Sequence, residues 1–388
     1  MGVCVLALSA CGDDGSSASA DDDAGGSTTG EVSLPGYSTG SLETMTTASS
    51  TGADGSESGG SSDSGVSECG DLDNDPANCG FCGHDCGDAA CLQGFCDPVV
   101  YEENGIGPQD LVLTDSHLFW VDYSTAVLRC EVAGCPEGAE VFASYDRVPA
   151  MSVTDDVLYF SSLGTGQVLS CPTSGCEGEP DVIATDMATP FSPIRSGDRV
   201  YFTDPDMGGV FSCPAAGCEG VPTMLATGTE PLVSVADEST LYFTDRMADE
   251  VRSCALPDCE GGSTLLAGGQ DGALGLFLFE GDLYWSNQAG GEVRMCAADD
   301  CEATTVTLAA EQDAPGDIIV DEQGVYWVNF GMVTGSVAGC SDRTCTEEPV
   351  SFAETDDHPI AVQMDADRLY WVNYGTGFSD GGVFSVPR

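Results

Sequence analysis

Short runs of apolar and aromatic residues recur along most of the chain at a nearly constant interval. Each run joins a Leu or Val to two aromatic residues, and the last copy, residues 369–373, reads Leu-Tyr-Trp-Val-Asn. Counted on the second aromatic, the steps between copies are 40, 42, 41, 42, 42 and 44 residues. Such short runs are typical of β-strands, and a period of about 40–45 residues is typical of propeller blades. The earlier copies are Leu118-Phe119-Trp120, Leu158-Tyr159-Phe160, Val200-Tyr201-Phe202, Leu241-Tyr242-Phe243, Leu283-Tyr284-Trp285 and Val325-Tyr326-Trp327.

Each repeat contains four β-type runs separated by turn residues, as a four-stranded antiparallel blade requires. The seventh repeat ends with the chain after three runs. A fourth run stands at the other end of the repeat region, in Val99-Val100-Tyr101-Glu102. We therefore predict an all-β fold: a closed seven-bladed β-propeller over residues 98–388, in which this N-terminal strand completes the last blade and leaves no open edge between first and last blades.

Cysteines follow the third run of the first six repeats in a fixed pattern, Val-x-x-Cys with a second cysteine five residues later. A hairpin turn of that length can bring facing Cα atoms to the ~5.5 Å that a disulfide needs. We predict six hairpin disulfides, each worth about 2 kcal/mol. Zinc is the alternative, but it would require two blades to combine four thiolates. The pairs are Cys130/Cys135, Cys171/Cys176, Cys213/Cys218, Cys254/Cys259, Cys296/Cys301 and Cys340/Cys345.

The composition is strongly acidic, and it narrows the chemistry that the chain can perform. Ten basic residues, all Arg, stand against 65 acidic ones, so the net charge is 10 − 65 = −55. Without lysine there is no Schiff-base or lysine-base chemistry, and three histidines provide few general bases. Nucleic acid should be repelled, whereas cations and basic partners should be attracted. A highly solvated surface is the preferred interpretation of the charge.

The N-terminal segment has a pattern of its own. Residues 3–10 form an apolar run that ends in Leu8-Ser9-Ala10-Cys11. This resembles the signal peptide and lipobox of bacterial lipoproteins, although the basic residues that normally precede the apolar run are missing. The resemblance implies that residues 1–11 direct export and that lipidated Cys11 anchors the protein to the cell envelope. It leaves open whether the anchor lies in the inner membrane, the outer membrane or at the surface.

Residues 12–67 consist almost entirely of Ser, Gly, Thr, Ala, Asp and Glu. Such a segment buries too little apolar surface to offset its ordering entropy. We predict a disordered tether with a reach on the order of 40 Å.

Residues 68–97 hold six cysteines: Cys69, Cys79, Cys82, Cys86, Cys91 and Cys96. The stretch from Asn78 to Cys86 resembles the Asn-Cys-Gly-x-Cys-Gly-x-x-Cys core of Stig1-like cysteine-rich modules. An even cysteine count in an exported chain favours disulfides, whose connectivity the sequence does not give. The alternative is zinc held by Cys79, Cys82, Cys86 and His84. A calcium loop beginning at Asp71 is disfavoured by Pro76, which stands where an EF-hand loop needs glycine.

The aromatic runs resemble the Tyr-Trp-Thr-Asp strands of LDL-receptor-type and TolB-like propellers, and Leu241-Tyr242-Phe243-Thr244-Asp245 is the nearest copy. The resemblance implies the propeller fold and no particular ligand. An Asp or Asn ends six of these runs, and we interpret these residues as turn caps rather than ligands. They are Asp122, Asp204, Asp245, Asn287, Asn329 and Asn373.

The best candidate ligand site lies on the sixth and seventh blades. The in-register valine follows the second aromatic by 7 or 8 residues in five blades, but by 10 after Trp327 and 12 after Trp371. These longer loops should meet the segment that enters the seventh blade, on the face where propellers gather ligands. The predicted site is Phe330, Asp356, Asp357, His358, Asn373, Tyr374, Phe378 and Asp380.

These features together favour a non-enzymatic binding module, a monomeric propeller with an unidentified protein or glycan ligand and no cofactor. The alternative is a propeller lyase or hydrolase acting on an extracellular polymer, with Asp356, Asp357 and His358 around a metal such as weakly bound calcium. No catalytic triad can be assembled from spacing alone.

Overall fold

The computed structural model describes residues 71–388 except 124, 177, 332–333, 356 and 376–379. The predicted signal peptide, the lipidation residue Cys11, the tether of residues 12–67 and Cys69 therefore lie outside the described residues. So do two residues of the predicted ligand site, Asp356 and Phe378. Within the described part of the chain, no helix has the length and apolar character needed to cross a bilayer.

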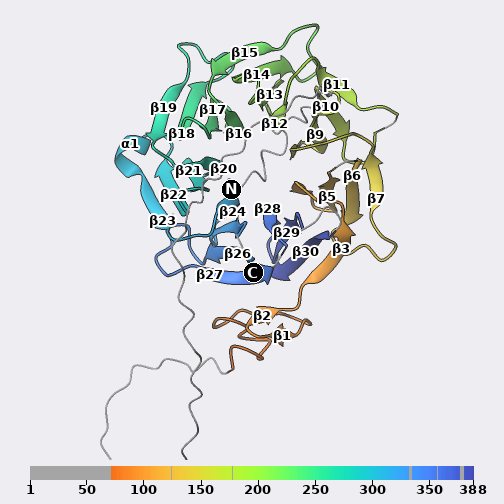
Figure 1. Cartoon of the computed structure of the whole chain (residues 1–388), viewed down its shortest axis with the longest axis vertical. Coiled ribbons are helices and arrows are strands. Elements are labelled where there is room, and N and C mark those ends of the chain that lie inside the picture. The colour runs from red at the N-terminus through yellow and green to blue at the C-terminus, as the bar shows by residue number, and fades with distance from the viewer. Residues whose placement is uncertain (1–70, 124, 177, 332–333, 356, 376–379) are drawn as a thin grey trace, which may run out of the picture. The chain divides into compact units, whose positions relative to one another are not determined.

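Seven four-stranded antiparallel sheets are arranged around a central axis, which confirms the predicted seven-bladed propeller (Figure 1). From inner to outer strand, the first four blades are β4 (Leu111–Leu113), β5 (His117–Asp122), β6 (Ala126–Glu131), β7 (Glu140–Ala143); β8 (Met151–Thr154), β9 (Val157–Ser162), β10 (Gln167–Pro172), β11 (Asp181–Ala184); β12 (Phe191–Ser196), β13 (Arg199–Asp204), β14 (Gly209–Pro214), β15 (Thr223–Thr227); and β16 (Pro231–Ala236), β17 (Thr240–Asp245), β18 (Glu250–Ala255), β19 (Thr264–Gly268).

The fifth and sixth blades follow the same order, and the seventh takes its outer strand from the start of the ring. They are β20 (Ala273–Phe279), β21 (Asp282–Asn287), β22 (Glu292–Ala297), β23 (Val306–Ala309); β24 (Pro315–Val320), β25 (Val325–Asn329), β26 (Gly335–Cys340), β27 (Val350–Thr355); and β28 (Pro359–Met364), β29 (Arg368–Asn373), β30 (Gly381–Pro387), β3 (Val99–Gly105). A single-turn helix, α1 (Cys301–Thr304), lies between β22 and β23.

The pairing of β3 with β30 closes the ring, as predicted. Val100 lies opposite Phe384, and Glu102 opposite Val383. The closing strand is also tied to the first blade, because the Tyr101 hydroxyl donates to the Val132 carbonyl at 2.9 Å. The indole of Trp120 in β5 donates to the Glu102 carboxylate. The orange and dark blue ends of the ring therefore lie side by side in Figure 1.

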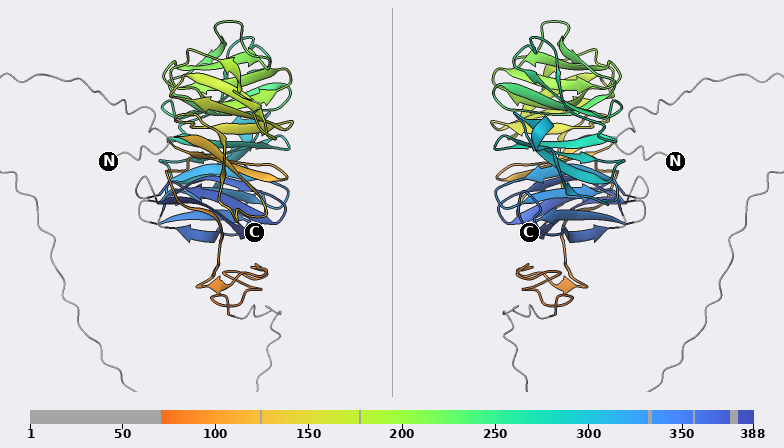
Figure 2. Two further views of the ribbon diagram at one scale, coloured as in Figure 1. Left: turned by 90° about the vertical axis from the view of Figure 1, so that its right-hand side faces the viewer. Right: turned by 90° about the vertical axis from the view of Figure 1, so that its left-hand side faces the viewer.

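The aromatic repeats form the core between blades. In β5, neighbouring Phe119 and Trp120 are both fully buried, although successive strand residues point to opposite faces of a sheet. Both faces of the blade must therefore be covered. Phe119 packs with Phe160 of the second blade, and Trp120 packs with Tyr370 of the seventh. Figure 2 shows the sheets from the side, stacked face to face around the ring.

Each of the first six blades carries a disulfide between its third strand and the connection that follows, which confirms the six predicted pairs. The Cα–Cα distances lie between 4.9 and 5.6 Å. Pairing both sulfurs removes the thiolates on which the zinc alternative depends. The bonded pairs are Cys130–Cys135, Cys171–Cys176, Cys213–Cys218, Cys254–Cys259, Cys296–Cys301 and Cys340–Cys345.

The second cysteine of each pair does not lie on a strand, so these bridges do not join residues that face each other on two neighbouring strands. The first cysteine belongs to the third strand in every blade, but the second precedes the outer strand and lies in the connecting segment. In each of these blades the outer strand begins ten residues after the first cysteine, so a cysteine five residues on lies in the connection and the bridge joins a strand to its own turn. Cys135, Cys176, Cys218, Cys259 and Cys345 lie in irregular backbone, and Cys301 begins α1.

These bridges also anchor the turns to the core between blades. Cys259 and Cys301 are buried, and Cys135, Cys176, Cys218 and Cys345 are half-buried against the same apolar clusters as their blades. The seventh blade has Val386 opposite Leu369, where the other blades carry a cysteine. Its outer strand arrives from the other end of the chain, so it has no continuous hairpin to bridge.

The cysteine-rich segment is held by disulfides that the sequence left unassigned. Cys79 pairs with Cys91 and Cys86 with Cys96, and Cys82 is also disulfide-bonded. Its two short strands are β1 (Cys91–Leu92) and β2 (Phe95–Cys96).

This segment packs on the propeller through aromatic rings. Phe81 and His84 stack in parallel, with centroids 4.5 Å apart, and both meet the ring of Phe352 on β27 edge-on. His84 also has its Nε2 atom 3.2 Å from the carbonyl oxygen of Pro387. Residues 71–97 therefore share a core with the last two blades.

Candidate functional site

Antiparallel connectivity places two sets of loops on one face of the ring: those that lead into inner strands, and those that join second to third strands. We call this the entry face. The predicted ligand site lies there, on the loops after β25 and β29 and on the segment before β28.

His358 and Phe330 form the centre of the site. Their rings stack with centroids 4.3 Å apart and planes inclined by 15°. The His358 Nδ1 atom lies 3.1 Å from the Phe330 carbonyl oxygen, so Nδ1 carries a proton and donates it. In the neutral imidazole, Nε2 is then the acceptor, and the side-chain hydrogen bond that His358 makes to another described residue is the one from Nδ1. Phe330 is buried in the core rather than exposed as expected, and it serves as the platform beneath the imidazole.

The two loops of the seventh blade are joined backbone to backbone. The Tyr374 amide donates to the His358 carbonyl at 3.0 Å, and the Gly375 amide donates to the Asp357 carbonyl at 2.8 Å. Burial raises the pKa of the Tyr374 phenol, which therefore stays neutral at physiological pH. The loop is thus fixed where it meets His358. Asp380 is partly exposed, immediately before β30.

Asp204 and Asp245, which end the second strands of the third and fourth blades, cap the entry loops, which confirms the interpretation as turn caps for these two residues. The Asp204 carboxylate accepts from the Ala188 and Thr189 amides at 2.9 and 3.1 Å. The Asp245 carboxylate accepts from the Thr229 and Glu230 amides at 2.7 and 2.8 Å. These carboxylates are occupied by the backbone.

In the fifth and sixth blades, asparagine replaces the aspartate and a glutamine completes the cap. The Gln270 Oε1 atom accepts from the indole of Trp285, at 2.9 Å, and from Asn287. The Gln312 Oε1 atom accepts from the indole of Trp327 and the amide of Asn329, both at 3.0 Å. The glutamine precedes the tryptophan by 15 residues in both blades.

The cap of the seventh blade differs. Asn373 is buried and its Nδ2 atom donates to Thr355 at 2.8 Å. The buried Trp371 indole has no acceptor among the described residues. In sequence register, the residue 15 positions before Trp371 is Asp356. Asp356 lies outside the described residues, so its predicted part in the ligand site is not tested.

The described residues offer no intact metal centre at this site. Within them, the single group of three potential ligand side chains is Cys79, Cys86 and Cys96. All three sulfurs are in disulfides, so they lack the thiolate that a metal needs.

Two features escaped the sequence analysis. The first is a groove of about 620 Å³ along the flank between the fifth and sixth blades, lined by Gln312 and Asn329 and by the exposed carboxylates Glu311, Glu347 and Glu348. The second is a pair of aspartates inside the ring, Asp110 and Asp317. The available signal for the second was a carboxylate two residues after the proline that opens the inner run, which occurs in the first and sixth repeats alone.

The cap of the sixth blade generates a stability prediction. Gln312→Leu should lower the free energy of unfolding by about 1–3 kcal/mol, because it leaves the buried Trp327 indole without an acceptor and removes one of the two acceptors of the Asn329 amide. Gln312→Glu keeps two acceptor oxygens and should recover most of the loss. Gln323→Leu, on an exposed turn, should change little. Denaturant unfolding measures all three, and equal stability of Gln312→Leu and the wild type would contradict the capping role.

The comparisons with known proteins bear on the fold. No protein-family model and no curated protein matches the chain. Among solved structures, virginiamycin B lyase from Staphylococcus aureus superposes with a TM-score of 0.60 at 11% identity, covering 75% of this chain and 99% of the lyase. A streptogramin B lyase structure gives 0.60 at 10% identity, covering 74% and 96%. The AfRom2 CNH domain gives 0.52 at 11%, covering 75% and 99%. At these identities the chain shares the propeller fold with them, and nothing is implied about its activity.

Proposed function

We propose that the propeller is a non-enzymatic binding module whose contact surface is the entry-face rim of the sixth and seventh blades. One observation carries the proposal: His358 is fixed on Phe330 by ring stacking and by its Nδ1 hydrogen bond, so that among the described residues Nε2 is not used in holding the ring. A pre-oriented imidazole beside a fixed loop can accept a hydrogen bond from a ligand at little entropic cost.

The surroundings of the rim support binding rather than catalysis. The flanking groove carries three exposed carboxylates, which favour a partner with basic groups.

The rim can be tested with matched histidine variants. His358→Ala should weaken binding of an immobilised glycan or basic-protein ligand about tenfold or more, since it removes the acceptor and the stacked ring. His117→Ala is the control, because His117 begins β5 at the opposite end of its blade. Candidate ligands come from a glycan array and a panel of basic proteins, and calorimetry gives the affinities.

Two results would oppose this proposal. Equal affinity of His358→Ala and the wild type would remove the rim as the contact surface. Turnover of a glycan or ester library by the wild type, lost in His358→Ala, would establish the enzymatic alternative.

The proposal includes attachment to the cell envelope. The Leu8-Ser9-Ala10-Cys11 motif supports lipidation of Cys11, and a tether of residues 12–67 would hold the ring away from the membrane. A labelled fatty acid should be incorporated by the wild type in a bacterial host and should be absent from Cys11→Ser. Cys4→Ser is the matched control and should stay labelled. Labelling that persists in Cys11→Ser would refute the anchor.

A further inference from the structure

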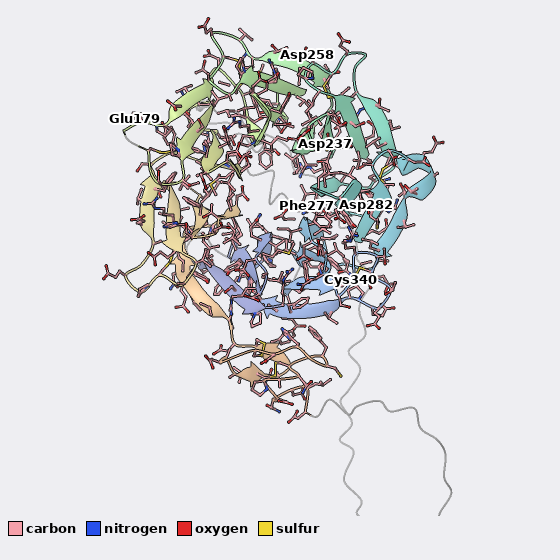
Figure 3. The ribbon with its side chains drawn as sticks, turned by 180° about the vertical axis from the view of Figure 1, so that it is seen from behind. Glu179, Asp237, Asp258, Phe277, Asp282 and Cys340 are labelled. Carbon is pink, nitrogen blue, oxygen red and sulfur yellow. A yellow bond between two sulfur atoms is a disulfide. The ribbon has the colours of Figure 1, made fainter. Side chains whose placement is uncertain are left out.

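The seven inner strands enclose a cavity of about 370 Å³, which we call the channel. Its volume falls within the range of about 300–1,000 Å³ typical of small-molecule sites. Phe277 of β20, labelled in Figure 3, contributes to its wall from the inner side of the ring.

The wall of the channel is divided into an apolar and a polar sector. The second to fifth blades contribute mainly hydrophobic side chains, among them Val153, Ile194, Val235 and Phe277. Their serines Ser192 and Ser234 are hydrogen-bonded to each other and to the backbone. The sixth, seventh and first blades contribute apolar residues too, and they add the polar side chains Asp317, Gln363, Gln109 and Asp110.

The two aspartates clamp neighbouring blades together. Asp110 accepts from the Leu111 amide at 2.8 Å and from Met151 of the second blade at 2.6 Å. Asp317 accepts from the Ile318 amide at 3.0 Å and from Val362 of the seventh blade at 2.9 Å. A carboxylate offers about four acceptor positions, so each aspartate retains two.

Ionising either carboxylate inside the ring costs free energy, because the charge is largely removed from water. Burial inside the ring and, to a smaller extent, the charge of Asp317 raise the pKa of Asp110 to about 7. Burial likewise raises the pKa of Asp317 to about 6. They are the titratable side chains that line the channel among the described residues. A cation placed between them would compensate the two charges.

Gln109 gives independent support for a ligand. The residue is 9% exposed and lines the channel, and its side-chain amide makes no hydrogen bond to another described residue. Because the amide atoms are not sealed in protein but open to the channel, a molecule bound there can accept and donate the hydrogen bonds that the protein does not supply. The other six inner strands have Ala, Phe, Leu, Leu, Gly and Ile at this position.

We propose that the channel binds a small organic cation, an ammonium group on an apolar body. The ammonium would lie at Asp110, Asp317 and Gln109, and the apolar body against the second to fifth blades. An inorganic cation would leave the apolar sector without a role, and a neutral apolar molecule would leave the carboxylates uncompensated. This site is separate from the entry-face rim and does not depend on the function proposed for it.

The test uses the intact protein and phenethylammonium chloride, followed by calorimetry. Three reference ligands separate the contributions: 2-phenylethanol has the shape without the charge, methylammonium has the charge without the body, and calcium is an inorganic cation. We expect binding of phenethylammonium that exceeds binding of each of the three by about tenfold or more. Equal binding of any reference ligand, or no binding of phenethylammonium at millimolar concentration, would overturn the proposal.

Variants locate the site. Asp110→Asn and Asp317→Asn should each weaken binding about tenfold, and Gln109→Leu should weaken it without disturbing either interblade clamp. Asp367→Asn is the control, because it removes one negative charge on an exposed turn outside the channel. If the aspartate variants fail to fold, Gln109→Leu decides alone. Unchanged affinity in Gln109→Leu would then contradict the site.

The pH dependence gives a readout that a purely structural role would not produce. Protonated carboxyl groups cannot compensate an ammonium ion, so affinity should rise about tenfold or more from about pH 5 to about pH 8. Binding that is independent of pH would overturn the assignment of the two aspartates.

Discussion

Every sheet in this ring has two apolar faces, and both must be removed from water. The fully buried neighbours Phe119 and Trp120 illustrate the constraint, because they point to opposite faces of one blade. A row of such blades always leaves one face uncovered at each end, and only a closed ring covers both. The hydrophobic effect on paired faces therefore determines the circular arrangement.

Closure of the ring affects both the outer strands and the inner strands of the blades. At the outside, the last blade takes its fourth strand from the start of the repeat region, so Tyr101 and Glu102 can contact the first blade. At the inside, seven inner strands converge on an axis, where backbone amides of one blade face side chains of the next. Asp110 and Asp317 accept hydrogen bonds from those amides and are half-buried inside the ring as a result.

Much of the architecture could be predicted because it depends on the intervals between particular residues along the sequence. The interval between aromatic runs indicated the blades, and the offset of Val99-Val100-Tyr101-Glu102 indicated the closing strand. The five-residue cysteine interval identified the hairpin disulfides, although not that the second cysteine lies in the turn. The pairing of Cys79 with Cys91 and of Cys86 with Cys96 was not predictable, since several connectivities suit six cysteines at short intervals.

The candidate site was predictable only in outline. Loop length placed His358 and Phe330 together, but the burial of Phe330 depends on ring orientation, which spacing does not encode. The caps show a similar limit. The Gln312 side chain accepts a hydrogen bond from the indole of Trp327, 15 residues later in the sequence, and no local sequence pattern predicts that contact. The surroundings of the two channel carboxylates could not be predicted from the sequence, because their hydrogen-bond partners come from adjacent blades of the closed ring.

Hydrogen exchange followed by mass spectrometry tests closure most directly, on the amides of β3. The register with β30 predicts slow exchange for residues 99–105, comparable to that of the outer strand β7 in the first blade. Exchange of residues 99–105 at the rate of an unstructured peptide, with β7 protected, would contradict a ring completed by this strand.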